Sequence, residues 1–246
     1  LTELVGLDTW DMSNCTSIYS MFDGCSLMNE NSLQGLYNWD VSSVTEMSRA
    51  FKGTGVTNTS FCSNWNVAEV EYINAMFMST KLIEADLSNW QNTNNIMNLG
   101  SVWYGLFQNC KDLITVNVTG LVKSSCTKIG YVFEDCSKLT TIVGMDTWDV
   151  SNVILSERMF FNATSLVNIN GMFSPIKWNL EEYTGTNFNN CSKLSVESLV
   201  SILDALYDFA SEGNTDTHNI TLGSTNLAKL TDEQIAIATN KGWTVS

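Results

Sequence analysis

The chain has 246 residues, of which 44% are hydrophobic, so it can bury a continuous core as one elongated domain. Its 26 acidic and 12 basic residues give a net charge of −14, which argues against a nucleic-acid partner, because binding nucleic acid requires a clustered positive surface. No apolar run is long enough to span a bilayer, so no membrane insertion is expected within this chain.

An internal repeat is the main feature of the sequence. Residues 1–14 align without a gap on residues 139–152, with ten of the fourteen positions identical. Each unit begins at a tryptophan, at Trp10, Trp39, Trp65, Trp90, Trp148 and Trp178. A phenylalanine follows in each unit, at Phe22, Phe51, Phe77, Phe107, Phe133, Phe160 and Phe188. We therefore expect seven repeats of about 28 residues, each packed against its neighbours, with the phenylalanines stacked as an internal ladder.

Three units depart from the regular pattern, two in the spacing between the aromatic residues and one in the tryptophan itself. Four units keep a spacing of twelve residues, whereas the Trp90 unit has seventeen and the Trp178 unit has ten. Leu121 replaces the tryptophan of the fifth unit. The Trp90 unit therefore carries an insertion, which we place around Asn92 to Trp103.

The first half of each unit predicts a short helix. In the Trp39 unit, apolar residues recur in steps of three and four, at Val41, Val44, Met47, Ala50 and Phe51. Ser13-Asn14 and Ser151-Asn152 stand where a side-chain oxygen would cap such a helix.

The second half of each unit predicts a short strand, as in residues 113–118, 139–142 and 166–169, whose apolar residues face inward. One strand and one short helix per unit, always in the same order, predict parallel strands and a right-handed coil.

These residues resemble a known family. The strings Trp148-Asp-Val-Ser-Asn-Val153, Met159-Phe160 and Cys136-Ser-Lys-Leu139 are similar to the repeat of BspA-like bacterial surface proteins, a branch of the leucine-rich-repeat solenoids. The resemblance covers residues 1 to about 194 and implies an α/β repeat fold, a right-handed leucine-rich-repeat-type solenoid with a parallel β-sheet and short helices. A WD-repeat propeller would need about 40 residues and four strands per blade, so the Trp-Asp pairs do not indicate that fold.

The repeat stops after Leu194, and residues 195–246 predict an α/β cap. Ser195 precedes an amphipathic helix of about fourteen residues, and residues 220–222 form a short strand. Thr231 and Gln234 open a second helix as a capping box, Gly242 ends it, and residues 243–245 close as a strand. We therefore expect a seven-repeat solenoid over residues 1–194 and a capping segment of the same structural domain over residues 195–246.

All seven cysteines occupy small or apolar positions of the repeat, where a free cysteine behaves as a small hydrophobe. Four of them follow the repeat phenylalanine by three residues: Cys25, Cys110, Cys136 and Cys191. The other three, Cys15, Cys62 and Cys126, replace valine or leucine. No CxxC pair with zinc-ligand spacing occurs, so we expect reduced, buried thiols, no metal and no cofactor.

The sequence does not indicate a catalytic centre. His218, the one histidine, lies beside Asp216 without a Gly-x-Ser-x-Gly motif, and we expect it in a solvated loop. The pairs Asp8 with Asp11 and Asp146 with Asp149 follow the repeat, as expected for aspartates that bond backbone N–H groups in turns. We assign no catalytic residues and expect no enzyme.

The candidate partner-binding residues lie on the outward side of the predicted strands. When alternate residues of a strand face inward, the others form columns along the array. These columns hold Glu84 and Asp86, Thr115 and Asn117, Thr141 and Val143, and Asn168 and Asn170. The columns are polar and slightly acidic, so we expect a polar or basic partner on this concave sheet. The insertion around Asn92 to Trp103 is the alternative site.

Three functions remain open. The first is a non-enzymatic extracellular or cell-surface adhesion module that binds a protein or glycan on a host or neighbouring cell. The second is a phage or virion receptor-binding or tail component, because the C-terminal segment is similar to closures of repeat proteins of gut bacteria and their phages. The third is a glycoside-directed enzyme, which would need a lone carboxylate pair in a cleft. A monomer is expected, with any targeting signal outside this sequence.

Overall fold

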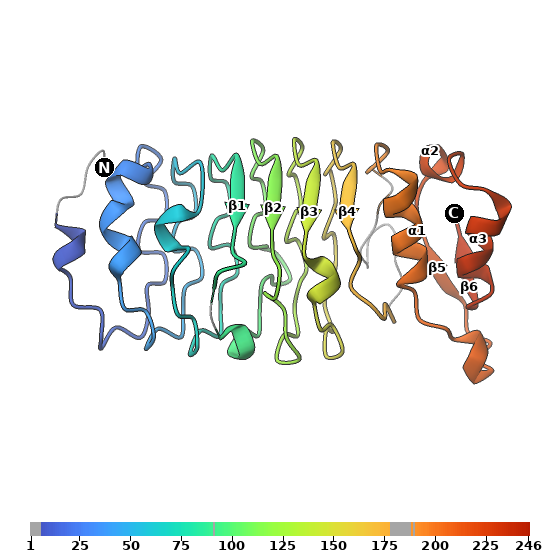
Figure 1. Ribbon diagram of the computed structural model, residues 1–246, viewed down its shortest axis with the longest axis horizontal. Helices are drawn as coiled ribbons and strands as arrows, with labels where there is room; N and C mark the ends of the chain where they lie inside the picture. Colours follow the sequence, from blue (N-terminus) through green and yellow to red (C-terminus); the bar gives the residue numbers. More distant parts are fainter. Residues whose placement is uncertain (1–5, 91, 178–187, 189) are drawn as a thin grey trace.

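The computed structural model describes residues 6–90, 92–177, 188 and 190–246, and it is an α/β protein with a parallel sheet and short helices. Successive segments of the chain lie side by side along the long axis of the molecule, from the N-terminal to the C-terminal end (Figure 1). Residues 1–5, at the start of the internal repeat, and Trp178 lie outside the described residues.

Four short parallel strands form the main sheet, in the order β1 (Glu84–Asp86), β2 (Thr115–Asn117), β3 (Thr141–Val143) and β4 (Asn168–Asn170). The central residues of the four strands are paired in register and buried: Ala85, Val116, Ile142 and Ile169. The strands have the same order in the sheet as in the sequence, so every connection is a crossover of one repeat length. The expected strand direction and inward positions are confirmed here.

The expectation of one strand in every unit is wrong for the units that begin at Trp10 and Trp39. The corresponding chain forms the 3₁₀ helices η2 (Glu30–Asn38) and η3 (Ser60–Cys62). Single-turn 3₁₀ helices also occur elsewhere, as η1 (Leu7–Thr9), η4 (Thr93–Asn95), η5 (Met145–Thr147) and η6 (Ala210–Glu212).

Side chains explain why the first two units have no strand. The Asn29 side chain accepts hydrogen bonds from the N–H groups of Asn31 and Ser32, which starts η2. The Glu30 carboxylate then accepts the N–H groups of Thr57 and Asn58. These two amides therefore bond to a side chain, where the later units have a strand.

The short helix predicted before each repeat phenylalanine is also wrong, because the chain forms a run of turns there. Alternate N–H groups bond to the next unit, as Ile18 N does to Glu46 O at 2.9 Å and Phe22 N to Ala50 O at 2.8 Å. The N–H groups between them bond to the carbonyl three residues back, as Met21 N does to Ile18 O at 3.1 Å. Ser13, expected as a helix cap, instead donates its N–H and hydroxyl to Asp11.

Left-handed residues at fixed positions allow these turns. They lie two residues before the repeat phenylalanine (Ser20, Arg49, Ala75, Tyr131 and Arg158) and two residues after it (Gly24, Gly53, Ser79, Asn109, Asp135 and Asn162). Their φ angles lie between 52° and 76°. A non-glycine residue in this region costs roughly 1–3 kcal/mol, which the hydrogen bonds to the next unit offset.

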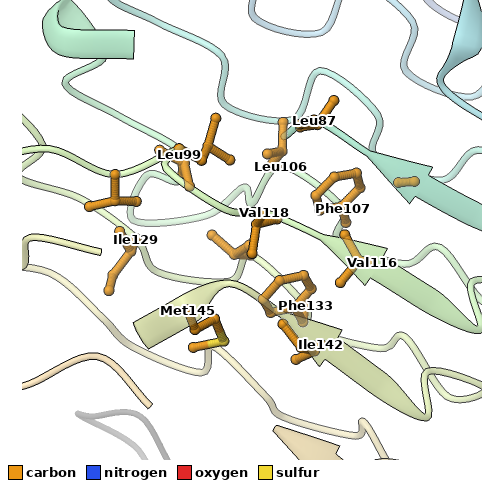
Figure 2. Close-up of a cluster of buried hydrophobic side chains, with 14 of the residues drawn as sticks. Leu87, Leu99, Leu106, Phe107, Val116, Val118, Ile129, Phe133, Ile142 and Met145 are labelled. Carbon is orange, nitrogen blue, oxygen red and sulfur yellow. The ribbon is translucent and has the colours of Figure 1, made fainter. Parts of the chain in front are cut away.

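The predicted phenylalanine ladder is confirmed. All seven rings are at most 4% exposed, and neighbouring ring centroids are 5.5, 5.9, 5.7, 5.9, 5.9 and 5.0 Å apart from Phe22 to Phe188. Figure 2 shows Val116 and Ile142, from β2 and β3, beside Phe107 and Phe133 in this core. The sheet and the run of turns therefore enclose one continuous column of aromatic rings.

The repeat tryptophans connect each unit to the preceding one. The indole N–H of Trp39 donates to Leu7 O at 2.7 Å, and that of Trp65 donates to Leu36 O at 2.9 Å. Trp90 and Trp148 make the same bond, to Cys62 O and Val118 O, each at 2.9 Å. A buried indole N–H needs such an acceptor, which explains the fixed place of tryptophan in the unit.

All seven cysteines are free, and the predicted burial holds for five of them: Cys62, Cys110, Cys126, Cys136 and Cys191. Cys15 and Cys25, in the first unit, are only half-buried, which corrects the prediction for them. The thiol of Cys110 donates to Phe77 O at 3.0 Å, so it joins neighbouring units as well as filling space.

The C-terminal segment forms the predicted α/β arrangement with different boundaries. Helix α1 (Val196–Asp204) has nine residues, fewer than expected, and Ser195 caps it. Strand β5 (His218–Ile220) starts two residues early, and α2 (Ser224–Leu227) was not expected. The capping box of Thr231 and Gln234 opens α3 (Asp232–Thr239) as predicted, and β6 (Trp243–Val245) pairs in parallel with β5.

Candidate functional site

The strand register brings the predicted binding residues together as two columns. Glu84, Thr115, Thr141 and Asn168 are paired neighbours in one column, and Asp86, Asn117, Val143 and Asn170 are paired neighbours in the other. Each of these eight residues is exposed or half-buried, in contrast to the buried residues between them.

A shallow open depression of about 500 Å³ lies over one half of these columns. It contains Glu84, Asp86, Thr115 and Asn117 of the seven predicted polar residues, together with Val143. The other three, Thr141, Asn168 and Asn170, do not line it. The predicted surface thus overlaps the depression at β1 and β2 and continues beyond it toward β4.

The depression also contains residues that the sequence did not single out. Asn58, Thr59, Ser60 and Ser63 come from the chain around η3, and Asn89 follows β1. The hydroxyl of Thr59 accepts from Asp86 N at 2.9 Å and donates to Asp86 O, so it takes the place of a strand partner for β1. The missing strand of the second unit thus leaves short polar side chains beside β1.

A second depression adjoins the first. It is lined by Glu30, Tyr37, Ser60, Phe61 and Ser63, and it shares Ser60 and Ser63 with the first. Tyr37, at the end of η2, is 47% exposed. We call the two depressions together the strand groove; it runs across the units from η2 to β3.

Some polar groups of the strand groove are already used within the protein. Asp86 Oδ1 accepts both the N–H and the hydroxyl of Ser88, and Asn117 Oδ1 accepts both from Thr119. The side chains of Glu84 and Thr115 make no hydrogen bond within the described part of the chain. The hydrogen bonds of Asp86 and Asn117 fix the backbone of the groove, whereas the side chains of Glu84 and Thr115 are exposed to solvent.

The groove is acidic. Its lining includes the carboxylates of Glu30, Glu84 and Asp86 and no lysine or arginine. Glu84 and Asp86 are the two nearby carboxylates that a glycoside hydrolase would require, but both are exposed, and Asp86 is bonded to Ser88. A glycosidase acid normally lies in an apolar pocket, which this open groove does not provide around either carboxylate.

The insertion of the Trp90 unit forms a separate projection, and its position differs from the expected one. Relative to the Trp65 unit, one extra residue precedes Ile96 and four lie between Leu99 and Leu106. Residues 100–105 form a tight hairpin in which Gly100 and Gly105 are bridged and Trp103, at the tip, is 70% exposed.

The base of this hairpin is tightly packed. A Cβ atom on Gly100 would lie 1.9 Å from the carbonyl oxygen of Gly130 in the next unit. The ring of Tyr104 lies 4.6 Å from the guanidinium carbon of Arg49. No residue of the hairpin lines either depression, so the hairpin is a separate candidate for the alternative site.

Three aspartates outside the strand groove have a structural role in turns. Asp11, Asp40 and Asp149 each accept the N–H of a serine two residues later, and these serine hydrogen bonds lower the pKa of all three carboxyl groups. This confirms the turn role expected of Asp11 and Asp149.

The expectation of a solvated His218 is wrong. His218 lies in β5, and its ring stacks on Phe209 with centroids 3.5 Å apart. Among the described residues, no group of three or more His, Cys, Asp or Glu side chains could hold a metal ion.

Comparison with known proteins identifies one family. A family model described as "Mycoplasma protein of unknown function, DUF285" matches residues 2–115 and again residues 103–201. No curated protein and no solved structure matches the chain. None of the helices in the described part of the chain is long and apolar enough to cross a membrane.

Proposed function

The chain belongs to the DUF285 family, and we propose that it is a non-enzymatic binding or adhesion module of the extracellular space or cell surface. In this proposal the strand groove binds a protein or glycan on a host or neighbouring cell, and the protein acts as a monomer.

We also propose that the repeats form a right-handed leucine-rich-repeat-type solenoid. The parallel order of β1 to β4 supports this, because crossover connections between parallel strands are right-handed in nearly all proteins. The similarity of the repeat to that of BspA-like surface proteins supports it as well.

The observation that carries the functional proposal is the strand groove itself. It is open, it crosses several units, and it combines a backbone fixed by internal hydrogen bonds with side chains that have unused polar groups. Extended faces of repeat proteins bind partners in this way, by offering many side chains to one ligand. The exposed position of Glu84 and Asp86 favours binding over catalysis.

Binding of the fluorescently labelled protein to cultured epithelial cells, measured by flow cytometry, tests this proposal. The test variant replaces both Glu84 and Asp86 by lysine, and the matched control replaces Glu69 and Glu71 by lysine. Both variants change the net charge equally at positions two residues apart, but Glu69 and Glu71 do not line the groove. We expect binding to fall only in the Glu84/Asp86 variant.

The loss of the Asp86–Ser88 turn should cost about 1 kcal/mol, so the melting temperature should fall by only a few degrees. If wild-type protein does not bind cells, the proposed function is wrong. If binding survives in the Glu84/Asp86 variant and is lost in Trp103→Ala, the binding site is the hairpin.

A further inference from the structure

We infer that the strand groove is a binding site for a neutral, linear oligosaccharide, with Tyr37 as its stacking platform. This inference rests on the proposed function and specifies the ligand of the same site. It follows from the shape of the groove, its charge, its unused polar groups and the position of its one exposed aromatic ring.

The shape favours a linear ligand. The groove runs from η2 through η3, β1 and β2 to Val143 of β3, which are parts of successive units. Neighbouring strands lie about 4.8 Å apart, so these units span roughly 20 Å. A sugar residue in an extended glycan is about as long as this strand spacing, so consecutive sugars can meet equivalent positions of consecutive units.

The charge of the groove determines which sugars fit. Glu30, Glu84 and Asp86 contribute three carboxylates, and neither depression contains a lysine or arginine to pair with an acidic sugar. Sialic acids, uronic acids and sulfated sugars would be repelled, because like charges without a partner oppose binding. Carboxylates are, in contrast, good acceptors for sugar hydroxyl groups.

The unused polar groups match a chain of hydroxyl groups. The side chains of Glu84, Thr115 and Asn89 make no hydrogen bond within the described residues. Asn58 lines the depression and uses its Oδ1 to accept Ser60 N at 3.0 Å, and its amide N–H groups donate no hydrogen bond within the described residues. The groove thus has both donors and acceptors, as recognition of hydroxyl groups requires.

Tyr37 supplies the apolar contact. It lines the end of the groove and is 47% exposed, so one face of its ring can pack against the C–H face of a sugar. Its place in η2 depends on the Asn29 cap and the missing strand of the first unit. The departure of this unit from the repeat therefore creates the platform.

A microarray of immobilised glycans tests the inference, with neutral linear oligosaccharides of two to six sugars beside sialylated, uronic-acid and sulfated ones. We compare the wild-type protein with Tyr37→Ala and, as a matched control, with Tyr19→Ala. Tyr19 is 52% exposed and lines neither depression. We expect binding to neutral linear glycans that strengthens with length, weakens about tenfold in Tyr37→Ala, and is unchanged in Tyr19→Ala.

The inference is overturned if the wild-type protein binds no neutral linear glycan, if it prefers acidic glycans, or if Tyr37→Ala and Tyr19→Ala bind alike. Cell binding separates this failure from failure of the proposed function. A protein ligand would be indicated if binding to cells depends on Glu84 and Asp86 and is lost after the cells are treated with protease but not with glycosidase. That result would support the proposed binding function and contradict the inference of a glycan ligand.

Discussion

Truncation of Phe77, an interior ring of the phenylalanine ladder, should destabilise the protein strongly. Phe77 is fully buried and stacks on Phe51 and Phe107, with ring centroids 5.9 and 5.7 Å away. It also meets Phe61 edge-on, at 6.5 Å. Phe77→Ala removes all of these contacts and leaves a cavity between three units, so we expect a loss of about 3–5 kcal/mol in the free energy of unfolding.

The end of the ladder provides a matched control. Phe22 is 4% exposed and stacks on only one described ring, Phe51, at 5.5 Å. Each aromatic pair contributes about 0.5–1.5 kcal/mol beyond the burial of its area. Phe22→Ala should therefore cost at least about 1 kcal/mol less than Phe77→Ala, although the same side chain is truncated.

Urea unfolding followed by both far-UV circular dichroism and tryptophan fluorescence measures this difference. Coincident transitions would justify a two-state free energy, which a repeat array does not guarantee. A loss below about 1 kcal/mol for Phe77→Ala would refute the ladder as the core. A loss no larger than that of Phe22→Ala would refute the contribution of ring stacking.

Three further predictions concern the thiols, the tryptophans and the hairpin. Burial raises the pKa of Cys110 and Cys126 to about 11, so the buried cysteines should react slowly with a thiol reagent in native protein. The half-buried Cys15 and Cys25 should react first, and all seven cysteines should react after denaturation. Trp148→Phe removes the bond to Val118 O and should cost at least about 1 kcal/mol in urea unfolding, whereas Trp10→Phe, at a 49% exposed position, should change stability by less than about 0.5 kcal/mol. Gly100→Ala should cost about 3 kcal/mol in the same assay because its Cβ would overlap the Gly130 carbonyl, and unchanged stability would contradict the packing of the hairpin base.

The repeat register could be predicted from the sequence because the aromatic residues report it directly. A buried tryptophan needs an acceptor for its indole N–H, and each repeat phenylalanine stacks on the phenylalanine of a neighbouring unit. Both positions are therefore kept even where an insertion changes the spacing between them. The inward residues of β1 to β4 followed from the same register.

The helices of the repeat could not be predicted correctly because a run of turns gives the same apolar spacing as a helix. Both arrangements bring every third or fourth side chain to one side. The distinguishing residues, such as Arg49 and Tyr131, have positive φ angles that their side chains do not reveal. The hydrogen bonds that stabilise them are made to the next unit, beyond the reach of a local pattern.

The candidate site was predictable only where the repeat is regular. Glu84, Asp86, Thr115 and Asn117 followed from strand alternation, and the structure places them in one depression. Tyr37 could not be found in this way, because η2 replaces the strand of its unit. An exposed tyrosine in a segment that departs from its repeat is the signal that could have indicated it.

The central claim is that the partner occupies the strand groove, and two substitutions in one column test it most directly. Thr115 and Asn168 start β2 and β4, both are exposed, and only Thr115 lines the groove. In the cell-binding assay, Thr115→Arg should weaken binding at least about tenfold, or 1.4 kcal/mol, and Asn168→Arg should leave it within about twofold, with equal melting temperatures. Equal effects of the two substitutions, or full binding by Thr115→Arg, would contradict the claim.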